Sequence, residues 1–150
     1  WDTEMISQGV AVLDRAVRLG RSGPLQVQAA IAALHAEAPT PEETDWPAIA
    51  ALYAELLRHS ATPVVRLNHA VAVAMAHGAD AGLVLLLEEG LAADLQSYSY
   101  YHAAVADLYA RVGRLPDARV AYDQALALTD SGPERRLLTH KRAALVIDET

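Results

Sequence analysis

The stretch YYHAAVADLYARVGRLPDARVAYDQALAL, residues 100–128, predicts two helices joined by a tight turn. Gly113 can end the first helix because glycine adopts a positive φ without a Cβ clash. Pro116 suits the first turn of the second helix, where its missing N–H is not needed. Alanines occupy the positions where the two helices would cross, namely Ala106, Ala118 and Ala125. The stretch therefore predicts an antiparallel helical pair with close backbone contact.

Larger side chains, Tyr109 and Tyr122, alternate with these alanines. The order of small and large residues around the glycine resembles a tetratricopeptide repeat, a helix–turn–helix unit of about 34 residues. The best match spans residues 99–132, with His102 in place of the usual aromatic residue near the start of the first helix. The resemblance implies helical pairs that stack, each burying its apolar face against the next.

Proline and glycine punctuation extends this pattern along the chain. Five prolines are placed at helix starts and four glycines at helix ends, so the local signals agree with one another. We expect helices over residues 3–19, 24–37, 46–59, 63–77, 79–89, 98–112, 115–128 and 133–147. Gly90 should stop the fifth helix, and residues 91–97 should form a looser connection. The expected fold is all-α, a right-handed solenoid of about eight helices in antiparallel pairs, with residues 1–150 as one domain and 133–147 as a capping helix.

The composition excludes several classes of function. The chain has 150 residues, a net charge of −7 and no cysteine, so disulfides, zinc knuckles and thiol catalysis are excluded. A nucleic-acid-binding domain would normally carry a basic stripe. The basic residues cluster only near the C-terminus, and we interpret that cluster as a solvated helix face: Arg135, Arg136, His140, Lys141 and Arg142. The sequence shows no signal peptide and no apolar run long enough for a membrane span. Because it begins at Trp1 inside a helical pattern, we expect it to be a fragment of a longer protein.

The residues do not form a known catalytic motif. There is no HExxH and no glycine-rich phosphate loop. His35 and Glu37 are the most suggestive acid–base or metal-binding pair, but residues two apart on a helix point in nearly opposite directions. We therefore expect no metal, no cofactor and no catalytic residue.

Polar residues on otherwise apolar helix faces are better candidates. Burying such a group without a partner costs about 1–3 kcal/mol. Gln28, His35, Asn68 and His102 should therefore bond to one another and fix the helix register, bond to loop backbone such as residues 38–45, or contact a partner. In a stacked arrangement Asn68, Tyr100, Asp107 and Arg111 should face a concave groove, and these four are the candidates for partner contact.

Several stretches together resemble one family: GPLQVQAAIAALHAEAPTPEETDWPAIAALY, PVVRLNHAVAVAMAHGADAGL, the 100–128 stretch and ERRLLTHKRA. They are similar to the C-terminal extension of extracytoplasmic-function RNA polymerase sigma factors with a tetratricopeptide-like tail. The family pattern usually has arginine where this chain has His69, and another residue where it has Val105. Ten residues match motif positions: Gln28, His35, Glu37, Thr44, Asp45, Trp46, Tyr53, Asn68, His102 and Asp107.

The resemblance implies a bacterial cytoplasmic protein whose tail regulates transcription initiation through protein contacts. The partners would be the N-terminal sigma regions in cis, RNA polymerase or a regulatory protein, with DNA bound only through those N-terminal regions. One alternative is a free-standing adaptor that binds a peptide through Asn68, Asp107 and Arg111. Another is a small-molecule sensor or enzyme that uses His35 and Glu37.

Overall fold

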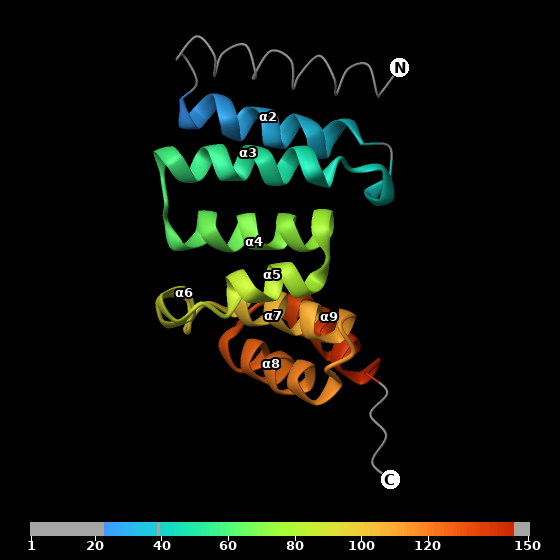
Figure 1. The fold of residues 1–150 in the computed structure, drawn as a ribbon. Helices are drawn as coiled ribbons and strands as arrows, with labels where there is room; N and C mark the ends of the chain where they lie inside the picture. The colour runs from blue at the N-terminus through green and yellow to red at the C-terminus, as the bar shows by residue number, and fades with distance from the viewer. Residues whose placement is uncertain (1–22, 39, 146–150) are drawn as a thin grey trace. The chain divides into compact units, whose positions relative to one another are not determined.

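The computed structural model describes residues 23–38 and 40–145, and these ranges contain eight α-helices, one 3-10 helix and no strand (Figure 1). The all-α prediction is thus confirmed for the described residues, while the helix expected over 3–19 lies outside them. The chain divides into two compact units, one ending at Ala76 and the other beginning at His77. The helices of the described ranges lack the length and apolarity needed to cross a membrane.

Within the described residues, the first unit contains three α-helices, each with a predicted proline at its first or second position. Helix α2 spans Pro24–Glu37, α3 spans Trp46–His59 and α4 spans Pro63–His77, with a 3-10 turn at Pro41–Glu43 before α3. Asp45 caps α3 by accepting a hydrogen bond of 3.1 Å from the Ala48 amide. The Thr62 hydroxyl accepts a bond from the Val65 amide in the first turn of α4. These caps satisfy amides that a helix leaves unpaired at its N-terminus.

Aliphatic side chains from all three helices form the core of the first unit. Helix α2 packs on α3, and Val65, Val73 and Ala76 of α4 pack against the same cluster. The fully buried members are Val27, Ile31, Leu34, Ile49, Ala50, Leu52, Leu56 and Ala72. Helical spacing predicts the α3 members of this face. On α2, however, the buried face carries Val27, Ile31 and Leu34, and not Gln28 and His35, which are exposed.

Over residues 77–145, the second unit contains five helices, of which α7 and α8 form the predicted pair. The helices are α5 (Ala79–Leu86), α6 (Glu89–Asp94), α7 (Ser99–Arg111), α8 (Leu115–Leu128) and α9 (Gly132–Ala143). Gly113 has a φ of 83°, and two hydrogen bonds close the end of α7, from Gly113 N–H to Ala110 and from Arg114 N–H to Tyr109. This is the Schellman arrangement that a glycine at this position favours.

The alanines predicted at the crossing of α7 and α8 are completely buried. Ala106, Ala118 and Ala125 are each 0% exposed, and Tyr122 is 3% exposed beside them. Tyr101 on α7 donates a 2.7 Å hydrogen bond to the Leu86 carbonyl at the end of α5. The side chain thereby joins the two helices through a group that α5 leaves unpaired.

The structure divides residues 79–97 into helices differently from the prediction. The expected single helix over 79–89 ends at Leu86, and the expected loose segment contains α6. The cause is Glu88, whose carboxylate accepts bonds from the amides of Gly90 and Leu91 and so begins a new helix. A Cβ at Gly90 would lie 3.2 Å from that carboxylate, so the glycine leaves room for the cap instead of ending the helix.

Helix α9 is shorter than the expected capping helix over 133–147, and it runs in the same direction as α7. The Ser99 hydroxyl, at the start of α7, donates to Glu134 near the start of α9, at 2.8 Å. Two turns further along both helices, Lys141 forms an ion pair with Asp107 at 3.2 Å. The two links fix the relative direction of α7 and α9.

The C-terminal basic cluster is only in part a solvated face. Arg135 donates to the carbonyls of Leu126 and Thr129 at the end of α8, and Arg142 pairs with Asp123. A cation at this position also interacts favourably with the negative end of the α8 dipole. Much of this cluster therefore holds α9 against α8.

Candidate partner-binding groove

A groove with a volume of about 420 Å³ lies among the three helices of the first unit. We name it the amide groove, because carboxamide side chains from two helices line it. Its lining residues are Gln28, Ile31, Ala32, His35, Tyr53, Leu56, Val64, Val65 and Asn68. Binding sites for small ligands and peptide side chains typically have volumes of about 300 Å³ or more.

Helical periodicity explains which residues reach the amide groove. Gln28, Ile31, Ala32 and His35 follow i, i+3, i+4, i+7 spacing and therefore share one face of α2. On α4 the residues Val64, Val65 and Asn68 share a face in the same way. Tyr53 and Leu56 of α3 complete the lining of the groove.

The amide groove has an apolar floor and polar edges. Ile31 and Leu56 are 5% and 2% exposed, so they belong to the core as well as to the groove. Gln28 and His35 are exposed, and Asn68 is half-buried. Among the described residues, the carboxamides of Gln28 and Asn68 have no hydrogen-bond partner. Each carboxamide offers two donors and one acceptor, so together they can bind a peptide main chain or another neutral polar group.

The structure brings four of the predicted polar residues to this groove: Gln28, His35, Tyr53 and Asn68. The first of the predicted arrangements, direct bonding of these side chains to one another, is not seen among the described residues. The exposure of Gln28 and His35 removes the need for it, because water can satisfy them.

Three further motif residues build the start of α3. Asp45 is the N-cap, the Thr44 carbonyl accepts a bond from the Trp46 amide, and the ring of Trp46 meets His35 edge-on at 5.3 Å between centroids. The motif thus holds the end of α2 close to the start of α3. Glu37 is the last residue of α2, and its side chain lies outside the described part of the structure.

The predicted contact residues of the second unit have varied surroundings. Asp107 accepts a 2.5 Å hydrogen bond from Tyr122 and pairs with Lys141, so its carboxylate is held within the unit. Burial, followed by the bond to Asp107, raises the pKa of Tyr122. Tyr100 is 45% exposed, and partial burial raises its pKa, with smaller effects from neighbouring Tyr98 and Asp107. Arg111 is exposed at the end of α7. The concave groove expected to join Asn68 to these residues would involve both units, because Asn68 belongs to the first and the others belong to the second.

His102 bonds to loop backbone, which is one of the expected arrangements, although the loop is not the 38–45 segment. Its ring nitrogen Nε2 lies 2.7 Å from the carbonyl oxygen of Gln96, a residue of the turn that precedes α7. The ring also meets Tyr101 edge-on at 5.2 Å. His102 therefore fixes the connection between α6 and α7, a contact that periodicity could not predict.

His69, which departs from the family pattern, is half-buried on α4. Burial lowers the pKa of His69 below its usual 6.5 because the charged form is disfavoured away from water. No group of three or more histidine, cysteine or carboxylate side chains that could bind a metal ion is present in the described ranges.

The described part of the chain is thus all-helical and has an open groove within each unit. No known protein-family profile matches the chain. It is 46% identical, over 134 residues, to an uncharacterized protein of Rhizobium meliloti (strain 1021). That match covers 89% of this chain but 31% of the relative, so the chain spans about a third of the relative's length. No solved structure matches the chain.

Proposed function

We propose that this chain is a non-catalytic regulatory and protein-interaction domain of an extracytoplasmic-function sigma factor, acting in transcription initiation. The observation that carries the proposal is the amide groove. Gln28, His35, Tyr53 and Asn68 were singled out as motif residues of that family, and all four line this groove. Residues with a purely structural role would not need to meet around an open surface.

The arrangement of helices supports a tetratricopeptide-like solenoid within each unit. Tetratricopeptide units place the first helices of successive pairs side by side and in the same direction, with the second helix antiparallel between them. The links from Ser99 to Glu134 and from Asp107 to Lys141 give α7 and α9 this relation, with α8 between them in sequence. In the first unit, α2 and α3 pack as a pair and α4 adds to the same core.

The chemistry of the amide groove favours a protein partner over a reaction. The described lining residues include no lysine, arginine, aspartate or glutamate, and His35 is edge-on to Trp46. Apolar side chains and unpaired carboxamides are suited to an extended or helical protein segment. The N-terminal sigma regions, RNA polymerase or a regulatory protein would supply that segment, in the bacterial cytoplasm.

The net charge of −7 is consistent with such partners. Sigma regions that touch promoter DNA are basic, and an acidic domain would be attracted to them at long range. DNA itself would be bound by those regions and not by this chain.

The test is transcription from a cognate promoter by RNA polymerase and the sigma factor that carries this chain, with and without residues 1–150. We expect the deletion to change the transcript yield. A loss would mean that the domain supports the active sigma factor, and a rise would mean that it inhibits it. An unchanged yield would refute the proposal and favour a free-standing adaptor.

A second set of variants assigns the effect to the amide groove. The double variant Gln28→Ala/Asn68→Ala should change the yield in the same direction as the deletion. Gln96→Ala removes a carboxamide from an exposed position outside this groove and should leave the yield unchanged. Equal yields from the wild type and the double variant would remove the amide groove from the proposal.

A further inference from the structure

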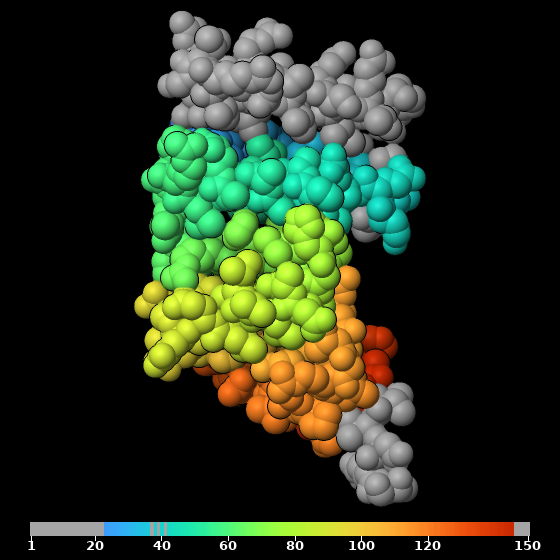
Figure 2. Space-filling model, in the orientation of Figure 1, coloured from blue at the N-terminus to red at the C-terminus, as the bar shows by residue number. Residues whose placement is uncertain are grey.

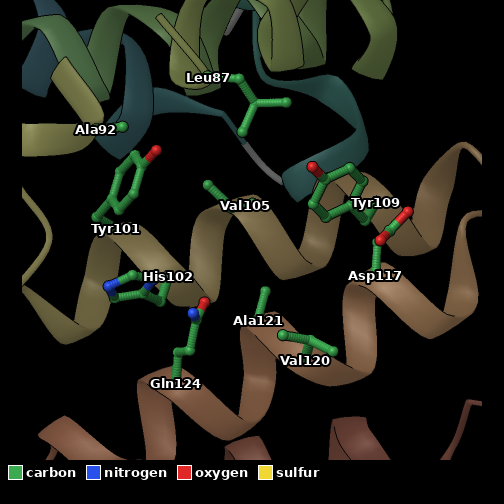
Figure 3. A pocket seen from close by; sticks show the side chains of 10 residues that line it. All are labelled: Leu87, Ala92, Tyr101, His102, Val105, Tyr109, Asp117, Val120, Ala121 and Gln124. Atoms are coloured by element: carbon green, nitrogen blue, oxygen red, sulfur yellow. The ribbon is translucent and has the colours of Figure 1, made fainter. Parts of the chain in front are cut away.

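A second groove, with a volume of about 310 Å³, lies entirely within the second unit (Figure 3). We name it the tyrosine groove, because the rings of Tyr101 and Tyr109 stand toward its two ends, with Val105 between them (Figure 3). Leu87 and Ala92 border it on the side of α5 and α6, and Val120 and Ala121 border it on the side of α8. The tyrosine groove shares no lining residue with the amide groove. Of the ten family-motif residues, His102 lines it.

The apolar lining of the tyrosine groove is partly in contact with solvent. Val105, Ala121 and Tyr101 are buried, at 6%, 3% and 4% exposure. Val120 is 58% exposed and Leu87 is 43% exposed, although both border the groove. Large apolar side chains that remain exposed around a hollow typically mark a binding surface.

The charge on the α6 side of the groove is negative. Helix α6 and its cap supply Glu88, Glu89 and Asp94, all exposed, and Ala92 on the same short helix borders the groove. Asp117 also lines the groove, but Arg114 pairs with it at 2.8 Å and covers the Tyr109 ring at 4.8 Å. The sequence between Arg66 and Arg111 contains no lysine or arginine. Figure 2 shows yellow atoms of the α5–α6 segment beside orange atoms of the α7–α8 pair on one face of this unit.

We propose that the tyrosine groove binds a basic amphipathic helix of a partner protein. Apolar side chains of that helix would enter between Leu87 and Val120, and its lysine or arginine residues would lie beside the carboxylates of α6. The argument is charge complementarity, since an apolar hollow with a carboxylate edge attracts a cationic segment and repels an anionic one. The proposal does not depend on the role in transcription, because it concerns a different surface of the chain.

The probe is a synthetic helical peptide of leucine and lysine, with leucines at i, i+3, i+4 and i+7 spacing. Two control peptides accompany it, one with the same composition in scrambled order and one with glutamate in place of lysine. Binding to the whole chain is followed by fluorescence anisotropy at low and high salt. We expect the leucine–lysine peptide to bind more tightly than both controls, and more weakly at high salt.

Two variants locate the binding. Val120→Asn removes apolar surface without adding charge, and it should weaken binding about tenfold, the scale of one buried aliphatic side chain. Glu89→Gln/Asp94→Asn neutralises two carboxylates of α6 and should weaken binding roughly tenfold at low salt. Glu42→Gln/Glu43→Gln removes the same charge from exposed positions in the first unit and should have little effect.

The changed side chains are exposed, so the variants should fold, and far-ultraviolet circular dichroism checks this. Equal weakening by the α6 pair and the Glu42/Glu43 pair would show attraction to overall charge only and would overturn the proposal. Equal binding of the glutamate peptide, or binding unchanged by Val120→Asn, would also overturn it. Because this assay needs no polymerase or promoter, its outcome is independent of the transcription experiment.

Discussion

Replacing Gly113 by alanine should destabilise the second unit by about 1 kcal/mol. Gly113 has a φ of 83°, a conformation that costs an L-residue about 1–2 kcal/mol. A Cβ built there meets no heavy atom within 4 Å, so no steric clash adds to this cost. Alanine also lowers the entropy of the unfolded chain, which offsets about 0.4–1 kcal/mol of the loss.

A change in the φ angle of residue 113 would relieve the backbone strain only at the expense of hydrogen bonds. The amides of Gly113 and Arg114 bond to Ala110 and Tyr109, and a change in φ would break both bonds. Each bond contributes about 0.5–1.5 kcal/mol, so we expect the turn to keep its conformation and bear the strain.

The assay is urea unfolding followed by far-ultraviolet circular dichroism, with tryptophan fluorescence as a reporter of the first unit, to which both Trp1 and Trp46 belong. Gly132→Ala is the matched control, because Gly132 is the first residue of α9 and its φ is not positive. That change should be neutral or slightly stabilising. Gly113→Asn should cost less than Gly113→Ala, because asparagine tolerates the left-handed region. A Gly113→Ala variant as stable as Gly132→Ala would refute the reasoning.

Two further predictions concern titrating groups. Tyr122→Phe should cost about 1 kcal/mol, because it removes the bond to Asp107 while that carboxylate keeps Lys141 and partial access to water. Because the pKa of Tyr122 is raised, its contribution to the free energy of unfolding is complete below the unfolded pKa of 10 and is lost as the pH rises above it. The Tyr122→Phe variant should therefore lose less stability in alkali than the wild type. The lowered pKa of His69 has the opposite effect on stability. The contribution of neutral His69 to the free energy of unfolding should be complete above pH 6.5 and should decrease as the pH drops below it. His69→Gln should reduce that acid slope, measured by urea unfolding between neutral and mildly acidic pH, and an unchanged slope would show that other groups cause it.

Motif residues that do not line the amide groove contribute to the structure beside it. Thr44, Asp45 and Trp46 were singled out as a motif, and the structure uses them to begin α3 and to place an aromatic ring against His35. A motif can therefore support the groove without lining it. Only Gln28, His35, Tyr53 and Asn68 reach the amide groove itself.

Local rules predicted most helix boundaries but not the break between α5 and α6. Proline at helix starts, the cap at Asp45 and the positive φ of Gly113 are each decided by a few neighbouring residues. Gly90 gave the same signal as a helix stop, yet it serves as the space beside the Glu88 cap. The sequence is compatible with both roles of Gly90, because glycine suits a helix end and a crowded cap equally well.

The sequence by itself determined the all-α class and the α7–α8 pair with the alanines at its crossing, because these follow from periodicity and turn chemistry within a few residues. The tertiary structure decided which faces meet. It placed Gln28 of α2 beside the groove that also contains Asn68 of α4, and it joined Ser99 to Glu134 and Asp107 to Lys141. It also left Val120 and Leu87 exposed beside the tyrosine groove. Such contacts join residues far apart in the chain, and they depend on how helices of particular lengths pack, which no local pattern specifies.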